Sequence, residues 1–331
     1  MKRLRSLLIT WEALLVVLLA ASIVIGGVTS PYFLSGFNFY AITSNIMEIA
    51  IMALPMTLII IAGEIDLSVA SVLGLASVVL GLLWQDGHPM WFAIGAALLV
   101  GLAAGSLNGL LVTKLGLPSL VITIGSLALF RGLAYVVLGD QAVSSFPTTF
   151  TNFGFSTIPG TEIPWSGLIF AILVIIFVVI LHFSRLGRQL YAIGSNKEAA
   201  RFSGINVNRV KLVLFMLSGL IAALAGVIFT ARFSSARPDN AVGFELEVVT
   251  VVLLGGVNIF GGRGTLLGVI LAIFILAVLQ NVLGLLNISG DIQSLAIGLL
   301  LILSVLGPNL ARRLSVVITR RRLVAGSSKQ V

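Results

Sequence analysis

Carboxylate and amide side chains interrupt the long apolar runs of this sequence. Glu48, Glu64 and Asp66 lie in or beside two of these runs, and Ser68 follows directly. A carboxylate at the centre of a bilayer costs roughly 2.5–3.5 kcal/mol on insertion scales, so it usually faces a cavity, a partner or an interface. Carboxylates and hydroxyls at such a place could contact a polyol. The alternative is an interfacial turn in which Asp66 or Ser68 caps the next helix.

Amides in other apolar runs extend this candidate path. An amide both donates and accepts hydrogen bonds, which suits sugar hydroxyls, although amides also hold membrane helices together. Further amides of this kind are Asn108, Gln280 and Asn281. We predict a translocation path lined by Asn45, Glu64, Asp66, Ser68 and Asn258.

The sequence offers little for enzyme chemistry. It has no cysteine, and its two histidines, His88 and His182, lie near different helix ends. Thiolate catalysis and Cys-ligated metals are therefore excluded, and we expect no metal site and no catalytic residue. None of the five lysines follows a glycine, so the phosphate-binding Gly-Lys-Ser/Thr signature is missing. If transport is driven by ATP, the nucleotide must bind another chain.

Composition places these residues in a membrane. Of the 331 residues, 58% are hydrophobic and 10% are charged, whereas an ordinary soluble domain is about 25% charged. The apolar runs are continuous and about 18–22 residues long, which is the length of a spanning helix rather than of a barrel strand. The sequence predicts an all-α polytopic membrane protein with about ten transmembrane helices. The expected spans are 11–28, 41–62, 67–83, 91–113, 119–138, 165–183, 211–231, 246–260, 265–286 and 292–307.

The basic residues give this bundle an orientation. All but three of the 20 lysines and arginines fall in one set of connections, which the positive-inside rule assigns to the cytoplasm. Both termini are then cytoplasmic, with 1–10 before and a basic tail at 311–331 after a transmembrane domain at 11–310. The loop 184–210 within this domain is cytoplasmic as well. The loop 139–164 and the segment 232–245 are external. The net charge of +8 is explained by this rule and by anionic lipid near the tail, so we expect no nucleic-acid partner.

Two of the three exceptions, Arg232 and Arg237, fall in the external segment. An arginine pair at the outer mouth could bind carboxylates of an external partner. The alternative is an ordinary solvated loop. We predict that both arginines dock an external partner protein.

Three motifs resemble those of a known family. The cytoplasmic loop contains Glu198-Ala199-Ala200 followed by Gly204, which resembles the Glu-Ala-Ala-x-x-x-Gly motif in permease subunits of ABC importers. The polar stretches 63–71 and 252–264 resemble two glycine-rich stretches of the ribose-type branch, and the resemblance covers about 40–310 in order. The overlapping stretches 62–68 and 255–264 are also candidate broken helices at corresponding positions of an internal repeat. Glu64 stands where the ribose-type branch usually has glycine. In this respect the sequence looks most similar to the rhamnose and autoinducer-2 permeases.

The resemblance implies a bacterial inner-membrane importer subunit. A periplasmic or extracellular sugar-binding protein would deliver a small sugar, and a second permease, identical or homologous, would complete the path. A separate ABC ATPase would bind ATP, so the chain itself needs no cofactor. Its contact would be a short helix formed by Glu198, Ala199, Ala200 and Gly204, with Glu198 facing the ATPase and the alanines keeping the docking face small. The alternatives are a proton-coupled secondary transporter working through Glu48 or Asp66, and a membrane scaffold or intramembrane enzyme.

Overall fold

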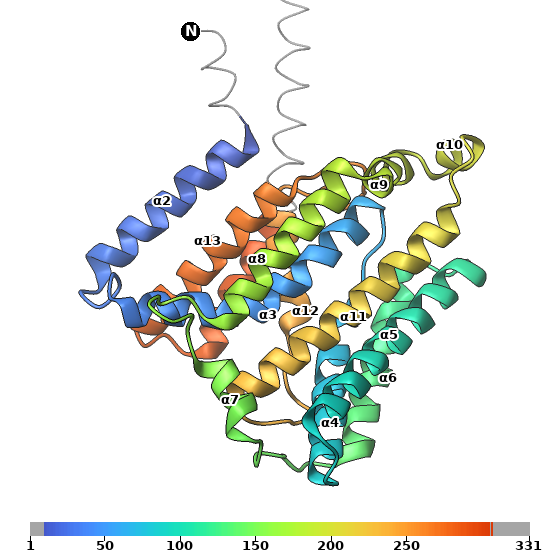
Figure 1. Ribbon diagram of the computed structural model, residues 1–331. Coiled ribbons are helices and arrows are strands. Elements are labelled where there is room, and N and C mark those ends of the chain that lie inside the picture. The colour runs from blue at the N-terminus through green and yellow to red at the C-terminus, as the bar shows by residue number, and fades with distance from the viewer. Residues whose placement is uncertain (1–9, 305, 307–331) are drawn as a thin grey trace, which may run out of the picture.

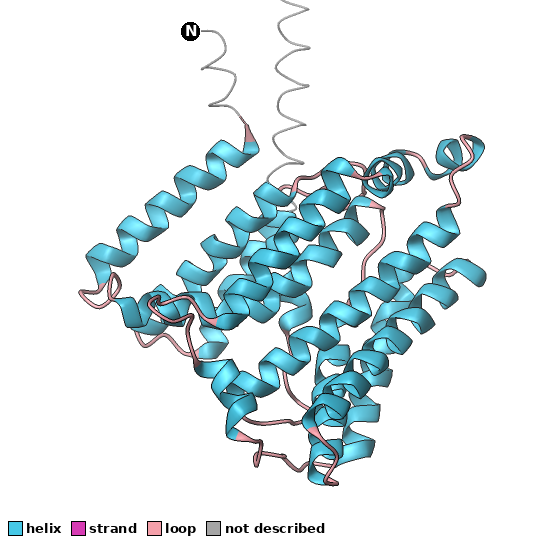
Figure 2. Ribbon diagram, viewed as in Figure 1, coloured by secondary structure: helices cyan, strands magenta, loops and turns pink. Residues whose placement is uncertain are grey.

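The computed structural model describes residues 10–304 and 306. This part of the chain is helical and contains no strand, only two isolated antiparallel bridges, Val143 with Ala236 and Thr157 with Pro164. Figure 2 shows helices joined by short loops. The all-α polytopic class is therefore confirmed.

Each of the ten predicted spans contains a helix. Seven helices, counting the π-helical turn η1 as the end of α8, are long and apolar enough to cross a membrane. Helices α4, α12 and the last one are shorter, so the number of spans stays a prediction. The helices are α2 (Trp11–Thr29), α3 (Gly36–Ile61), α4 (Val69–Gln85), α5 (Met90–Lys114), α6 (Ser119–Leu138), α7 (Thr148–Phe155), α8 (Trp165–Val178), η1 (Val179–Phe183), α9 (Arg185–Ser195), α10 (Lys197–Phe202), α11 (Val207–Phe233), α12 (Phe244–Leu254), α13 (Leu266–Leu285) and a last helix, Gly290–Ser304.

Hydroxyl side chains and prolines set the starts of the long helices. Ser35 and Thr265 accept hydrogen bonds from backbone N–H groups in the first turns of α3 and α13. Pro89, Pro118 and Pro164 directly precede α5, α6 and α8. Hydroxyls satisfy amides that the helix leaves unpaired, and proline fixes the entry dihedral without needing a donor.

Helix α3 forms the centre of the bundle. From Ile46 to Ala62 every residue is buried, and α3 packs against α8, α11, α12 and α13. Its neighbour α11 packs closely on α5, where a methyl group on Gly219 would lie 2.8 Å from the backbone nitrogen of Gly105. Small residues let the backbones of these two helices approach this closely.

The ends of the bundle are distinct. Figure 1 shows α9 and α10 at the end where α2 begins, with α7 at the opposite end. The loop after α12 lies at the α9 end, because the Trp11 indole donates to the Leu254 carbonyl (2.9 Å) and Thr265 donates to Glu12 (3.1 Å). The start of α2, the loop 184–210 and the second glycine-rich loop thus share one end of the bundle. The charge pattern assigns this end to the cytoplasm.

Candidate functional site

The two glycine-rich loops touch each other. The Gly262 N–H donates to the Ile61 carbonyl (2.8 Å), which ties the loop after α12 to the end of α3. A methyl group on Gly261 would lie 2.9 Å from the nitrogen and 3.0 Å from the Cα of Gly63. Gly63, Gly261 and Gly262 all have positive φ, which glycine adopts without strain. The two motifs therefore form one structural unit.

Helix α9 is attached to the same place. A methyl group on Gly194 would contact the Ile61 carbonyl and lie 3.1 Å from the Cα of Gly262. The Tyr191 hydroxyl donates to the Gly264 carbonyl (2.7 Å). We call the contact of Gly63, Gly194, Gly261 and Gly262 the glycine junction. Neither Tyr191 nor Gly194 was predicted from the sequence as a site residue.

Helix α10 carries the predicted ATPase contact. The Asn196 side chain caps it by accepting from the Ala199 N–H (2.9 Å), and it ends in a left-handed turn at Gly204 (φ 81°). The turn at Gly204 agrees with the expectation of a short helix followed by a tight turn. Glu198 is exposed and pairs with Arg201 of the same helix (3.1 Å).

One part of the expected docking face was wrong. Ala200 is only 4% exposed and packs into the core, so it faces the bundle. The reason is that residues two apart project to different sides of a one-turn helix. The exposed side carries Glu198, Ala199 and Phe202, of which Phe202 is 90% exposed.

Glu64 forms an ion pair with Lys211 near the start of α11. Both side chains are largely buried, with 13% and 6% exposure for Glu64 and Lys211. The ammonium of Lys211 also lowers the pKa of Lys197, the first residue of α10. Glu64 thus joins the first glycine-rich loop to α11. Its contact with a solute stays a prediction.

Asp66 and Ser68 belong to a buried hydrogen-bonded network. Asp66 accepts from the N–H (3.0 Å) and hydroxyl (2.6 Å) of Ser68, and from the Ser218 hydroxyl (2.8 Å). Asn108 donates to the Ser68 hydroxyl (2.8 Å). Asp66 binds the turn before α4, whose N-cap residue Ser68 makes no side-chain capping hydrogen bond, and a solute contact stays a prediction. Asn258 likewise shapes its own loop by accepting from the Phe260 N–H (3.0 Å).

The prediction of an exposed Arg232 was wrong. Helix α11 continues to Phe233, so Arg232 lies inside the bundle with 8% exposure. Its guanidinium forms a two-pronged ion pair with the fully buried Glu48 (2.8 and 3.0 Å) and donates to the Asn45 side-chain oxygen (2.9 Å). An arginine that compensates a buried carboxylate cannot also dock an external protein.

The other two exceptions to the charge rule differ. Arg237 remains exposed and pairs with Asp239 (2.9 Å), so docking by Arg237 stays a prediction. Hydrogen bonding from Arg237 lowers the pKa of Asp239. Arg131 donates to the Asn240 carbonyl (2.8 Å) and to the Pro238 carbonyl, which fastens the segment after α11 to the bundle.

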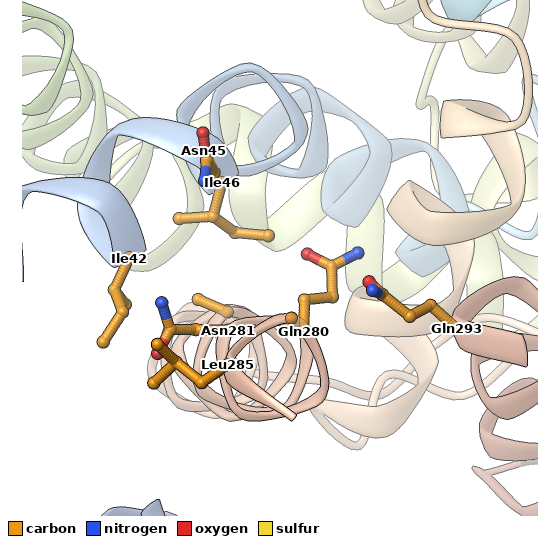
Figure 3. Close-up of a pocket in the computed structure, with 9 residues that line it drawn as sticks. Ile42, Asn45, Ile46, Gln280, Asn281, Leu285 and Gln293 are labelled. Atoms are coloured by element: carbon orange, nitrogen blue, oxygen red, sulfur yellow. The ribbon is translucent and has the colours of Figure 1, made fainter. Parts of the chain in front are cut away.

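A cavity of about 430 Å³ lies between α3, α13 and the last helix. Asn45 from the predicted path lines it, together with the amides of Gln280, Asn281 and Gln293 (Figure 3). Asn45 also lines a second cavity of about 290 Å³, together with Arg232 and the aromatic side chains of Phe37, Tyr40, Phe155 and Phe233. Of the predicted path residues, Asn45 lines these cavities and Glu64, Asp66, Ser68 and Asn258 do not.

Comparisons with known proteins agree with this architecture. Residues 38–305 match the family described as "Branched-chain amino acid transport system / permease component". The chain is 37% identical over 312 residues to the autoinducer 2 import system permease protein LsrD of Klebsiella pneumoniae subsp. pneumoniae, covering 92% of this chain and 93% of that protein. It is 37% identical to LsrD of Yersinia enterocolitica, covering 91% and 92% of the two chains. No solved structure matches.

Family and fold also fix the cellular location. The seven apolar helices and the permease relatives make this a multi-pass protein of the bacterial inner membrane. The chain belongs to the family of bacterial transport-system permease components, on the side of that family that contains the ABC permeases for sugars and autoinducer 2.

Proposed function

We propose that this chain is the membrane subunit of an ATP-driven importer for a small sugar or sugar-like molecule of the rhamnose, autoinducer-2 or ribose type. A separate ABC ATPase binds the exposed face of α10, and a periplasmic or extracellular binding protein delivers the solute. A second permease, identical or homologous, encloses the path. The names of the LsrD relatives support autoinducer 2 as one candidate solute.

The observation that carries this proposal is the glycine junction. Helix α10 adjoins α9 across Asn196, and α9 touches both glycine-rich loops through Gly194 and Tyr191. These contacts are mostly backbone against backbone, so they leave no flexible side chain to absorb a displacement. Movement of α10 by the ATPase would therefore reach the ends of α3 and α12 directly.

Site-directed cross-linking tests the ATPase contact. The chain has no cysteine, so a photo-reactive group attached to Glu198→Cys reports one position only. The matched control is Thr161→Cys, which is exposed beside α7 at the opposite end. In membranes containing the whole importer, we expect the Glu198 probe to cross-link to the ATPase and the Thr161 probe not to. The reverse pattern would contradict the proposal.

The energy source separates this function from a secondary transporter. In a proton-coupled transporter that works through Glu48, this carboxylate would have to leave its buried ion pair with Arg232. We expect uptake to stop when ATP is removed and to continue when an uncoupler dissipates the proton gradient. Uptake that collapses with the uncoupler but survives without ATP would establish the secondary transporter instead.

A further inference from the structure

The cavity between α3, α13 and the last helix opens at an unusual position of α3. Asn45 is the one exposed residue between Ile42 and Ala62 of this otherwise buried helix. The cavity volume of about 430 Å³ falls in the usual range of small-molecule sites, roughly 300–1,000 Å³. Its polar lining consists of side-chain amides and contains no charged side chain.

The orientation of the Asn45 amide is fixed by its neighbour. Arginine is a donor only, so the Asn45 atom that contacts Arg232 (2.9 Å) must be the oxygen. Arg232 is itself held in place by its two hydrogen bonds to Glu48. The amide nitrogen of Asn45, which makes no hydrogen bond within the described residues, is left as a donor at the cavity.

The orientation of the Gln280 amide is fixed in the opposite sense. An ionised carboxylate accepts only, so the Gln280 atom that contacts Glu247 (2.7 Å) must be the nitrogen. The Gln280 oxygen is left as an acceptor, unpaired within the part of the chain that the structure describes. Figure 3 shows this oxygen on the side of Asn45, with the nitrogen turned away.

Asn281 lines the same cavity, but its amide oxygen and nitrogen each already make a hydrogen bond. It exchanges two hydrogen bonds with Asn38, of 2.7 and 3.0 Å, which use both ends of its amide. Two adjacent amides on α13 thus have different capacities, one with a free acceptor and one already satisfied.

We propose that this cavity selects neutral hydroxylated solutes through a fixed donor, Asn45 Nδ2, and a fixed acceptor, Gln280 Oε1. A hydroxyl group both donates and accepts, so it can pair with either amide. An anion would gain little from Arg232, whose charge Glu48 balances. This inference rests on the proposed function and names the solute chemistry at the membrane subunit.

The test compares Gln280→Met with Asn281→Leu, two similarly shaped apolar replacements in one cavity. Vesicles carrying the whole importer are given radiolabelled ribose, rhamnose or autoinducer 2 at subsaturating concentration. The binding protein is the same throughout, so a difference between variants reports the membrane subunit. We expect Gln280→Met to lower uptake about fivefold, the loss of about one hydrogen bond, and Asn281→Leu to change it less than about twofold. Binding-protein-stimulated ATP hydrolysis should persist in both variants.

Unchanged uptake in Gln280→Met, or an equal loss in Asn281→Leu, would overturn this inference alone. A wild-type importer that transports none of the three neutral probes would contradict the proposed function as well. Because Gln280→Met leaves Glu247 without its partner, the double variant Glu247→Leu with Gln280→Met is assayed beside it. If the single variant fails to fold, the same fivefold loss is expected of the double variant, and its absence would overturn the inference.

Discussion

The glycine junction and the Asn45 region hold distant segments together by opposite means. At the junction, Gly194 and the two glycine-rich loops meet through backbone atoms with almost no side chain between them. Around Asn45, the contacts are made by the tips of long side chains, with Arg232 reaching Glu48 on another helix. The first region tolerates no added volume, and the second tolerates no unbalanced charge.

This difference matches two tasks in transport. A contact between backbone atoms does not distinguish one solute from another. It does pass a movement of α10 directly to the ends of α3 and α12, as coupling to an ATPase requires. A network of charged groups and amides can orient polar atoms for a solute but yields more easily to movement. The difference predicts that substitutions at the two regions will fail in separable ways.

The largest effect is expected from removing one member of the buried ion pair. Glu48→Leu leaves the Arg232 guanidinium uncompensated, and breaking such a pair usually costs about 3–5 kcal/mol. We expect a large fall in the melting temperature of the protein in detergent micelles, or loss of the folded protein. The double variant Glu48→Leu with Arg232→Met removes both charges and should recover most of that stability. A double variant as unstable as the single one would show that the unpaired charge of Arg232 does not cause the loss of stability.

A smaller effect is expected from adding a methyl group at the junction. Gly194→Ala places a Cβ against the Ile61 carbonyl and the Gly262 backbone, and overpacking of this kind costs about 1–3 kcal/mol. We expect ATP-dependent uptake to fall more than binding-protein-stimulated ATP hydrolysis, because the change lies on the mechanical link.

Gly125→Ala is the matched control for the junction. Gly125 is also a helical glycine, but a Cβ there would meet nothing within 4 Å. Its stability and uptake should match those of the wild type. Equal losses in both variants would mean that Gly194 matters only as a general helix residue.

These two regions also show how far the sequence could predict the molecule. The long helices follow from continuous apolar runs, and the glycine-rich stretches correctly marked breaks after α3 and α12. The contact between those breaks was not predictable, because Gly194 is one of 35 glycines and its partners are distant in sequence.

The prediction of an exposed Arg232 was wrong for a related reason. A charged residue was taken to end the seventh span, but a carboxylate 184 positions earlier, Glu48, allows the arginine to stay inside α11. Local hydropathy contains no information about such a partner. The same applies to Gln280 and Asn281, which look equivalent in sequence and differ only through Glu247 and Asn38.

The smallest effect is expected at the exposed pair Arg237–Asp239, outside both regions. Because Arg237 lowers the pKa of Asp239 in the folded protein, its stabilisation is fully present above the unfolded pKa, about 3.9. It is lost as the pH falls through the lower folded value. Arg237→Ala should therefore leave the melting temperature nearly unchanged at pH 7, since exposed pairs contribute little.

If Arg237 docks the binding protein, Arg237→Glu should weaken stimulation of ATP hydrolysis most at low salt, because salt screens exposed charges. Unchanged stimulation at every ionic strength would leave Arg237 as an ordinary loop residue and would confine the functional charges to the interior.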